Sequence, residues 1–127
     1  MAKMYENKAD HNQVFLDSII EDYPSEYFDW KVTVQFYIAL HRCYCVLDAS
    51  GETICNRHKD NINNLKSIDS GLSINLFKIY KNSRQSRYDG FINEDAMNRI
   101  NKINFEANKS SLSSINTGIA TYYPIAV

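Results

Sequence analysis

The sequence DWKVTVQFYIALHRCYC (residues 29–45) is the most apolar run of the chain, and it contains the only tryptophan. Apolar residues alternate with other residues over its first half, which is a strand pattern. The length of the segment decides against a strand, because its apolar character continues from Tyr27 to Leu47 without a turn residue. We therefore predict a long helix here.

Helical spacing sorts the residues of this segment into three faces. One stripe contains Trp30, Val34, Tyr37, His41 and Tyr44, and a second contains Thr33, Phe36, Leu40, Cys43 and Leu47. Lys31, Gln35 and Arg42 share the remaining face. A helix that is apolar on two of its three sides is typical of the centre of a bundle. The pattern thus predicts a central helix with Trp30 buried in the core.

The rest of the chain divides at its few glycines and at Pro24. With only four glycines and two prolines, the composition disfavours an all-β fold, which needs many turns. The spacing predicts further helices over Lys8–Tyr23, Arg57–Asp69 and Ser73–Tyr88, separated by Gly51, Gly71 and Gly90, and one that Asn93 caps. In the first of these helices His11, Phe15 and Ile19 fall one turn apart, flanked by Leu16, Ile20 and Tyr23, and in the second His58, Ile62 and Leu65 share a face. The third has Ile74, Phe77, Arg84 and Tyr88 near one face, and the last has Ala96, Ile100, Ile103 and Ala107. We expect these faces to point inward.

These segments predict an all-α fold, an antiparallel up-and-down bundle of four to five helices. At 127 residues the chain is expected to form a single domain over 1–127, with a short apolar tail at about 115–127. The net charge of −1 excludes a general attraction to nucleic acid or membrane, so binding of either would need a local patch. We expect a cytoplasmic protein, since no apolar signal segment opens the sequence and no run is long enough to span a membrane. Three cysteines without metal-ligand spacing indicate free thiols, no metal site and no cofactor.

With the helices placed, the order of several motifs resembles the HEPN superfamily of small helical proteins. The motifs are ADHNQVFLDSI in the first helix, DWKVTVQFYIALH in the second, NRHKDNINNL at the third, and SRQSRYDGF at the end of the fourth. The resemblance extends from about Ala9 to Phe105. It implies a helical bundle that commonly dimerises.

Many members of that superfamily are RNA-cleaving toxins or defence effectors, and others are non-catalytic partners of nucleotidyltransferases or RNA-binding modules. The nuclease members carry an arginine and, a few residues later on the same helix, a histidine. None of the arginines here is followed by a histidine at that interval. The resemblance therefore leaves both a catalytic and a non-catalytic role open.

Two histidines are candidates for acid–base chemistry, because imidazole titrates near neutrality. His41 is either a hydrogen-bonded core residue or a general acid or base at a cleft. His58 is either a partly buried residue at a helix start or the partner of His41. In the catalytic interpretation, the two histidines transfer protons and Arg84 offsets the charge of the phosphorane.

A basic stripe follows the fourth predicted helix. No acidic residue lies between Ser70 and Tyr88, so Lys78, Lys81, Arg84 and Arg87 can contact phosphates, with Tyr88 beside them. The alternative is a solvated helix face whose basic residues suit the C-terminal end of the helix.

Two functional hypotheses follow. The first is an HEPN-like module that acts on or near RNA, as a metal-independent ribonuclease or an RNA-binding component of a toxin–antitoxin or defence system. The alternative is a non-catalytic dimeric subunit that docks a partner enzyme such as a nucleotidyltransferase. The expected partners are a second copy of the chain in a homodimer, RNA, and a nucleotidyltransferase or antitoxin; no membrane is expected.

Overall fold

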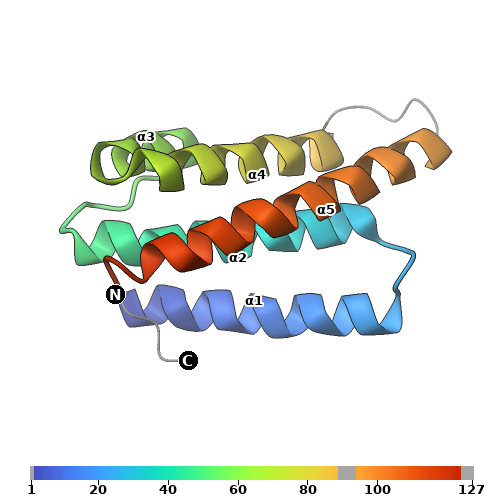
Figure 1. Ribbon diagram of the computed structural model, residues 1–127, viewed down its shortest axis with the longest axis horizontal. Coiled ribbons are helices and arrows are strands. Elements are labelled where there is room, and N and C mark those ends of the chain that lie inside the picture. The colour runs from blue at the N-terminus through green and yellow to red at the C-terminus, as the bar shows by residue number, and fades with distance from the viewer. Residues whose placement is uncertain (1, 89–93, 124–127) are drawn as a thin grey trace.

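The computed structural model describes residues 2–88 and 94–123, and over these ranges the chain forms five α-helices and no strand (Figure 1). The helices are α1 (Ala2–Asp22), α2 (Phe28–Ala49), α3 (His58–Ile68), α4 (Ser70–Tyr88) and α5 (Glu94–Ile119). In Figure 1 the four long helices alternate in direction along the long axis of the molecule, and the short α3 lies beside the start of α4. The predicted all-α fold, a bundle of helices, is confirmed for the described residues.

Helix α2 is the centre of the bundle, because it alone among the described helices packs against all four others. Every residue from Lys31 to Leu47 is buried except Tyr37 and His41, which are half-buried. Phe36 and Ile38 are completely enclosed. Since burial of apolar surface contributes roughly 25 cal/mol per Å², this helix is the main source of stability in the fold.

The predicted orientation of α2 is wrong at its first turn, where Trp30 is 59% exposed rather than buried. It is also wrong for the polar face, because Lys31 and Gln35 are only 1% exposed and Arg42 is 8% exposed. A helix surrounded by four others has no side left for solvent. Its polar residues are therefore enclosed: Lys31 donates to the Tyr23 carbonyl, Gln35 donates to the Phe105 carbonyl, and Arg42 pairs with Asp10 through Nη2.

Among the described helices, α1 packs closely against α2 alone, along a buried stripe of Tyr5, Ala9 and Leu16. The predicted inner stripe is wrong at His11, which is exposed, and at Phe15, which is 52% exposed, whereas Ile19 is half-buried against the core. The helix begins earlier than predicted, at Ala2, and Tyr5 and Ala9 set its inner face one position away from the expected one. Most residues of α1 are consequently not buried.

The turn into α4 is made by Asp69 and not by Gly71, which lies inside the helix. Asp69 has an extended backbone, and its Oδ1 accepts a hydrogen bond of 3.0 Å from the backbone N–H of Leu72. That bond and a second from the hydroxyl of Tyr122 lower the pKa of Asp69. The predicted break at Gly71 is thus replaced by a side-chain cap at the N-terminus of α4.

Helix α4 turns a different face inward from the predicted one. Leu72, Leu76 and Ile79 are buried, whereas Ile74 and Phe77 are 56% and 37% exposed. The side chain of Tyr88 lies outside the described residues. The expected break at Gly90 and the expected cap at Asn93 also lie outside them.

A polar seam joins α4 and α5, where apolar contacts were predicted. Asn101, Asn104 and Asn108 are buried, while Ile103 of the predicted inner face is 67% exposed. The amide of Asn108 donates to Oε1 of Gln35 on α2 at 3.0 Å, and its own Oδ1 accepts from Asn82 at 2.9 Å. Paired amides of this kind fix how the helices align, because an unpaired buried amide is costly.

The predicted tail from 115 onward is helical as far as Ile119, and both Ile115 and Ile119 are fully buried. After the helix, Tyr122 donates to Asp69 at 2.9 Å and Tyr123 donates to Glu6 at 2.8 Å. The end of the described chain is thereby attached to α1 and to the α3–α4 turn. Residues 124–127 lie outside the described residues.

Candidate functional site

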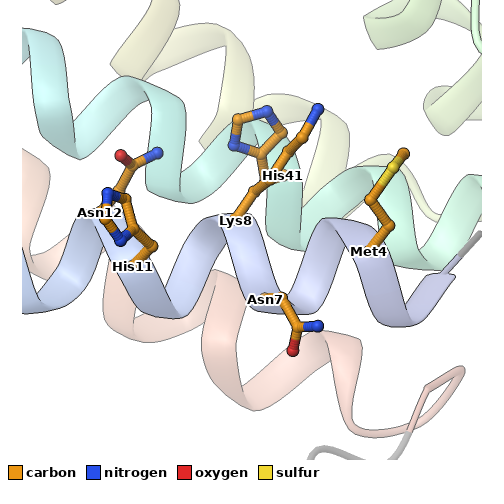
Figure 2. Close-up of a pocket in the computed structure, with 6 residues that line it drawn as sticks. All are labelled: Met4, Asn7, Lys8, His11, Asn12 and His41. Atoms are coloured by element: carbon orange, nitrogen blue, oxygen red, sulfur yellow. The ribbon is translucent and has the colours of Figure 1, made fainter.

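A polar pocket of about 700 Å³ opens between the N-terminal half of α1 and the middle of α2 (Figure 2). Its lining residues are Met4, Asn7, Lys8, His11, Asn12 and His41. Lys8, His11 and Asn12 are three and four residues apart, which places them on one side of α1. Figure 2 shows Lys8 beside the imidazole of His41, with His11 and Asn12 one turn further along α1. The pocket therefore combines two imidazoles, an ammonium and two amides.

His41 is half-buried and is held among the rings of Tyr5, Tyr37 and Tyr44, with ring-centre distances of 6.0–6.4 Å. Burial lowers the pKa of His41, and the nearby Lys8 ammonium lowers it further. The backbone carbonyl of Tyr37 acts in the opposite direction. The neutral imidazole is therefore favoured near pH 7, and it is the form that accepts a proton.

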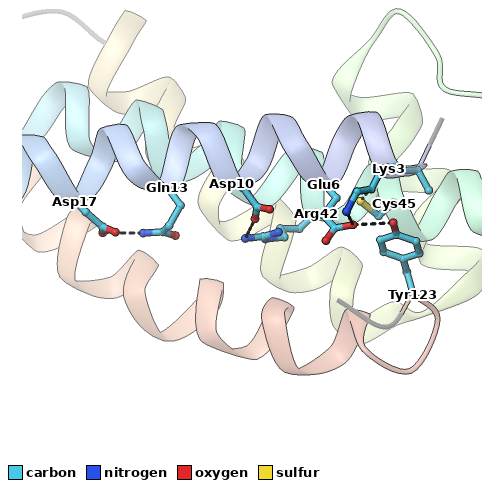
Figure 3. Close-up of polar contacts among 9 residues, drawn as sticks. Lys3, Glu6, Asp10, Gln13, Asp17, Arg42, Cys45 and Tyr123 are labelled. Carbon is cyan, nitrogen blue, oxygen red and sulfur yellow. Dashed lines mark hydrogen bonds and ion pairs between the residues drawn. The ribbon is translucent and has the colours of Figure 1, made fainter. Parts of the chain in front are cut away.

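The opposite side of α1 carries the ion pairs and hydrogen bonds that attach this helix to the bundle (Figure 3). Arg42 and Asp10 form a salt bridge of 2.9 Å, and in sequence they are next to His41 and His11 respectively. Glu6 is buried, and it accepts hydrogen bonds from Tyr123 and Lys3. The acidic residues in this half of α1 are thus engaged away from the pocket, which leaves Lys8 as its charged group.

The other predicted catalytic residues, His58 and Arg84, do not line this pocket. Both lie against Tyr80 of α4, His58 with a ring-centre distance of 6.2 Å and Arg84 with its guanidinium 5.9 Å from the ring. Phe36 of α2 lies edge-on against His58 with a ring-centre distance of 5.3 Å, and it also contacts Tyr37. His58 is close enough for its charge to lower the pKa of His41. The predicted set is therefore divided between two neighbouring places on the molecule.

The basic stripe of α4 is on the surface, where Lys78, Lys81 and Arg84 are all exposed. Lys81 lies 5.1 Å from the ring centre of Phe77, and Arg84 donates to the hydroxyl of Tyr80 at 3.4 Å. The side chains of Arg87 and Tyr88, which complete the predicted phosphate-binding set, lie outside the described residues.

Lys8 and His11 are the pocket residues that sequence reasoning missed. His11 was assigned to an inner apolar stripe, and Lys8 was taken only as the start of the helix. One available signal was the spacing of Asn7, Lys8, His11 and Asn12, four polar residues that share one side of a helix. Periodicity gives this grouping on α1, but it does not show that His41 of α2 faces it.

The three cysteines are free thiols, as expected, and two of them are buried. Burial raises the pKa of Cys43 strongly and that of Cys45 to about 11, so both are protonated and unreactive near neutral pH. Within residues 2–88 and 94–123, no three histidine, cysteine, aspartate or glutamate side chains are grouped closely enough to hold a metal ion.

None of the described helices combines the length and the apolar character that a membrane span requires. No protein-family model, curated protein or solved structure matches this chain.

Proposed function

We propose that the protein binds single-stranded RNA with a backbone phosphate in the α1–α2 pocket. We further propose that the two histidines of the pocket cleave the RNA without a metal ion. The observation that supports this most directly is the shared pocket of His41, His11 and Lys8. Cleavage next to a 2′-hydroxyl needs a base, an acid and a cation near one phosphate. These three side chains supply one group of each kind.

In this mechanism neutral His41 removes the proton of the 2′-hydroxyl, and the 2′-oxygen attacks the phosphorus. His11 in its protonated form donates a proton to the departing 5′-oxygen. The Lys8 ammonium and the Asn12 amide stabilise the charge on the phosphoryl oxygens. The products are a 2′,3′-cyclic phosphate and a free 5′-hydroxyl. The lowered pKa of His41 supports its role as the base.

This activity belongs to the class that the HEPN resemblance implies, although the pocket residues differ from the arginine and histidine pattern of the nuclease members. A toxin–antitoxin or defence setting follows from the same resemblance. In the catalytic hypothesis drawn from the sequence, His58 is the second proton-transfer residue beside His41, and Arg84 is the cation. The pocket favours His11 and Lys8 for these roles, because they share an opening with His41.

The second candidate is a non-catalytic interaction subunit. It is supported by exposed aromatic residues where α1 meets α2, including Trp30 at 59% exposure. The two candidates differ in a simple observable. A non-catalytic subunit leaves RNA intact even when it binds it.

The test is a cleavage and binding assay with fluorescent single-stranded RNA in the presence of EDTA. We expect the wild-type protein to cleave, and His41→Gln and His11→Gln each to lower the cleavage rate about 10²–10⁴-fold while binding is largely kept. Lys8→Gln should flatten the dependence of log affinity on log salt by about 0.7, the value for one phosphate of a single strand.

His58→Gln is the matched control, since it removes the one histidine outside the pocket. Cleavage that His58→Gln abolishes and His11→Gln leaves unchanged would assign the chemistry to the Tyr80 side of the molecule. RNA binding without cleavage would favour the interaction subunit. No RNA binding at all would reject both the proposed RNA binding and the proposed RNA cleavage.

A further inference from the structure

An apolar groove of about 420 Å³ lies at the opposite end of α1 from the histidine pocket. Its lining consists of Phe15, Ile19 and Tyr23 of α1, Tyr27 of the loop and Trp30 of α2. We call this surface the aromatic groove. Four of the five side chains are aromatic, and each of those four is at least 46% exposed. Large aromatic residues in such a position are the commonest energetic centres of protein interfaces.

The groove has a fixed shape, because the loop that forms it is hydrogen-bonded to the buried Lys31. Tyr27 has a φ of 57°, a left-handed conformation that is unfavourable for a residue with a side chain. The ring of Tyr27 packs edge-on against Tyr23 with a centre distance of 4.8 Å. Buried Lys31 donates its backbone N–H to the Tyr27 carbonyl and its ammonium to the Tyr23 carbonyl. Tyr27 is thereby held in a strained backbone conformation with its ring exposed beside Tyr23, and strain of this kind is typical of functional surfaces.

The charge around the groove selects a cationic partner. Five acidic residues and no basic one occur in the sequence between Phe15 and Trp30, and three of them, Asp22, Glu26 and Asp29, are each next in sequence to a groove residue. The nearest lysine in sequence, Lys31, is buried beneath the loop. The groove also lies at the C-terminal end of α1, where the helix dipole is negative. A partner that fits must therefore present apolar side chains among basic ones.

The outer face of α4 has this composition. It carries Ile74 and Phe77, which are exposed, flanked by Lys78, Lys81 and Arg84. These five positions fall on one side of the helix, because they are three or four residues apart. No acidic residue interrupts them between Ser70 and Tyr88. We call this surface the basic face.

We propose that two copies of this chain associate head-to-tail, with the basic face of one copy seated on the aromatic groove of the other. Phe77 is the apolar anchor that enters beside Trp30, and the lysines and arginine meet the acidic rim. This contact goes beyond RNA binding at the histidine pocket and does not depend on it.

The two surfaces cannot meet within one molecule, since α1 and α4 lie on opposite sides of α2 and make no contact with each other (Figure 1). The contact is therefore heterologous, and a pair of copies leaves one groove and one face unoccupied. Such contacts close into a ring or continue into a chain. A symmetric dimer, by contrast, would use the same surface on both copies.

The experiment uses two variants that each lose one surface, Trp30→Ser and Phe77→Ser, studied by sedimentation velocity. We expect the wild-type protein to form species larger than a dimer as its concentration rises, and each variant alone to associate at least about tenfold more weakly. An equimolar mixture of the two variants retains one intact groove and one intact face. It should form a 1:1 complex of two chains that does not grow further.

Val14→Ser and Ile103→Ser are the matched controls, because both remove an exposed apolar side chain outside the two surfaces, each 67% exposed in the wild type. Both should associate like the wild type. A wild-type protein that stays monomeric up to about 1 mM would overturn the proposal. So would a mixture of the two variants that fails to form the complex, or control variants that lose association as fully as Trp30→Ser.

Discussion

The two halves of α1 present opposite chemistry from a single helix. The N-terminal half places Lys8 and His11 around His41 of α2, while its acidic residues Glu6 and Asp10 are bonded to other groups. The C-terminal half exposes apolar side chains, and it carries three acidic residues and no basic one over residues 13–22. The two surfaces are suited to different partners, an anion at one end and a cationic apolar surface at the other.

The difference follows from how α1 is attached. Among the described helices α2 alone contacts it closely, and a narrow stripe through Tyr5, Ala9 and Leu16 makes that contact. The exposed positions on the other sides of α1 can carry binding residues. Helix α2 is the contrasting case, because all four described neighbours contact it and even Lys31 and Gln35 are enclosed.

The largest effect is expected from cutting the attachment of α1. Leu16→Ala removes a side chain that is 3% exposed, and it should lower the free energy of unfolding by about 2–5 kcal/mol. Phe15→Ala, at the next position, removes a larger but exposed side chain and should cost less than about 1 kcal/mol. Urea denaturation of both variants measures the contrast. Equal losses would mean that α1 packs through the predicted stripe instead.

An intermediate effect is expected at the salt bridge between Arg42 and Asp10. Asp10→Ala leaves a guanidinium that is largely buried without its carboxylate, and should cost about 1–3 kcal/mol. Arg42→Met removes the buried charge itself and should cost less, since the carboxylate left behind, Asp10, is 54% exposed and stays hydrated. Thermal unfolding of the single and double variants gives the coupling. A larger loss from Arg42→Met would contradict this account.

A smaller effect is expected from pH. Because burial lowers the pKa of His41 in the folded chain, the folded protein binds fewer protons than the unfolded chain below the ordinary histidine pKa. The stability associated with neutral His41 is complete above that pKa, and it is lost as the pH falls toward the folded value. Unfolding measured from pH 7.5 to 5 should show this loss, and His41→Gln should reduce it. An unchanged profile in the variant would place the titration elsewhere.

The smallest effect is expected at Trp30. Trp30→Ala should change the free energy of unfolding by less than about 1 kcal/mol, because the side chain is 59% exposed. Phe36→Ala, which empties a fully buried site on the same helix, should cost about 3–5 kcal/mol. A loss at Trp30 as large as that at Phe36 would mean that the tryptophan is buried and the aromatic groove is closed.

The helices could be predicted from the sequence more reliably than the faces they bury. Apolar length and periodicity located all five segments, but in α1, α4 and α5 the buried face differs from the one containing Phe15, Phe77 and Ile103. These large apolar residues lie on the surface, while asparagines occupy the core of the α4–α5 seam. Periodicity predicts the buried face from the positions of apolar residues. It does not predict that asparagine amides will be buried because they pair across helices.

The candidate site could be predicted only in part for a related reason. The sequence indicated that His41 could serve in acid–base chemistry, because imidazole titrates near neutrality. Its partners Lys8 and His11 depend on how α1 is aligned against α2, which is set by the contacts of Tyr5 and Ala9 with the α2 surface. His58 was predicted as the partner of His41, yet its ring lies against Phe36 and Tyr80 and does not line the pocket.

The three histidines allow one direct test of the histidine pocket as a phosphate site. The ring C–H resonances of His11, His41 and His58 can be followed by NMR while a single-stranded RNA oligonucleotide is added in EDTA. We expect the His41 and His11 resonances to move together and the His58 resonance to stay in place, with Lys8→Gln weakening the response. Bound phosphate should also raise the pKa of His41, because a nearby anion favours the imidazolium. Movement of His58 without His11, or no movement of any histidine, would contradict the assignment of this pocket.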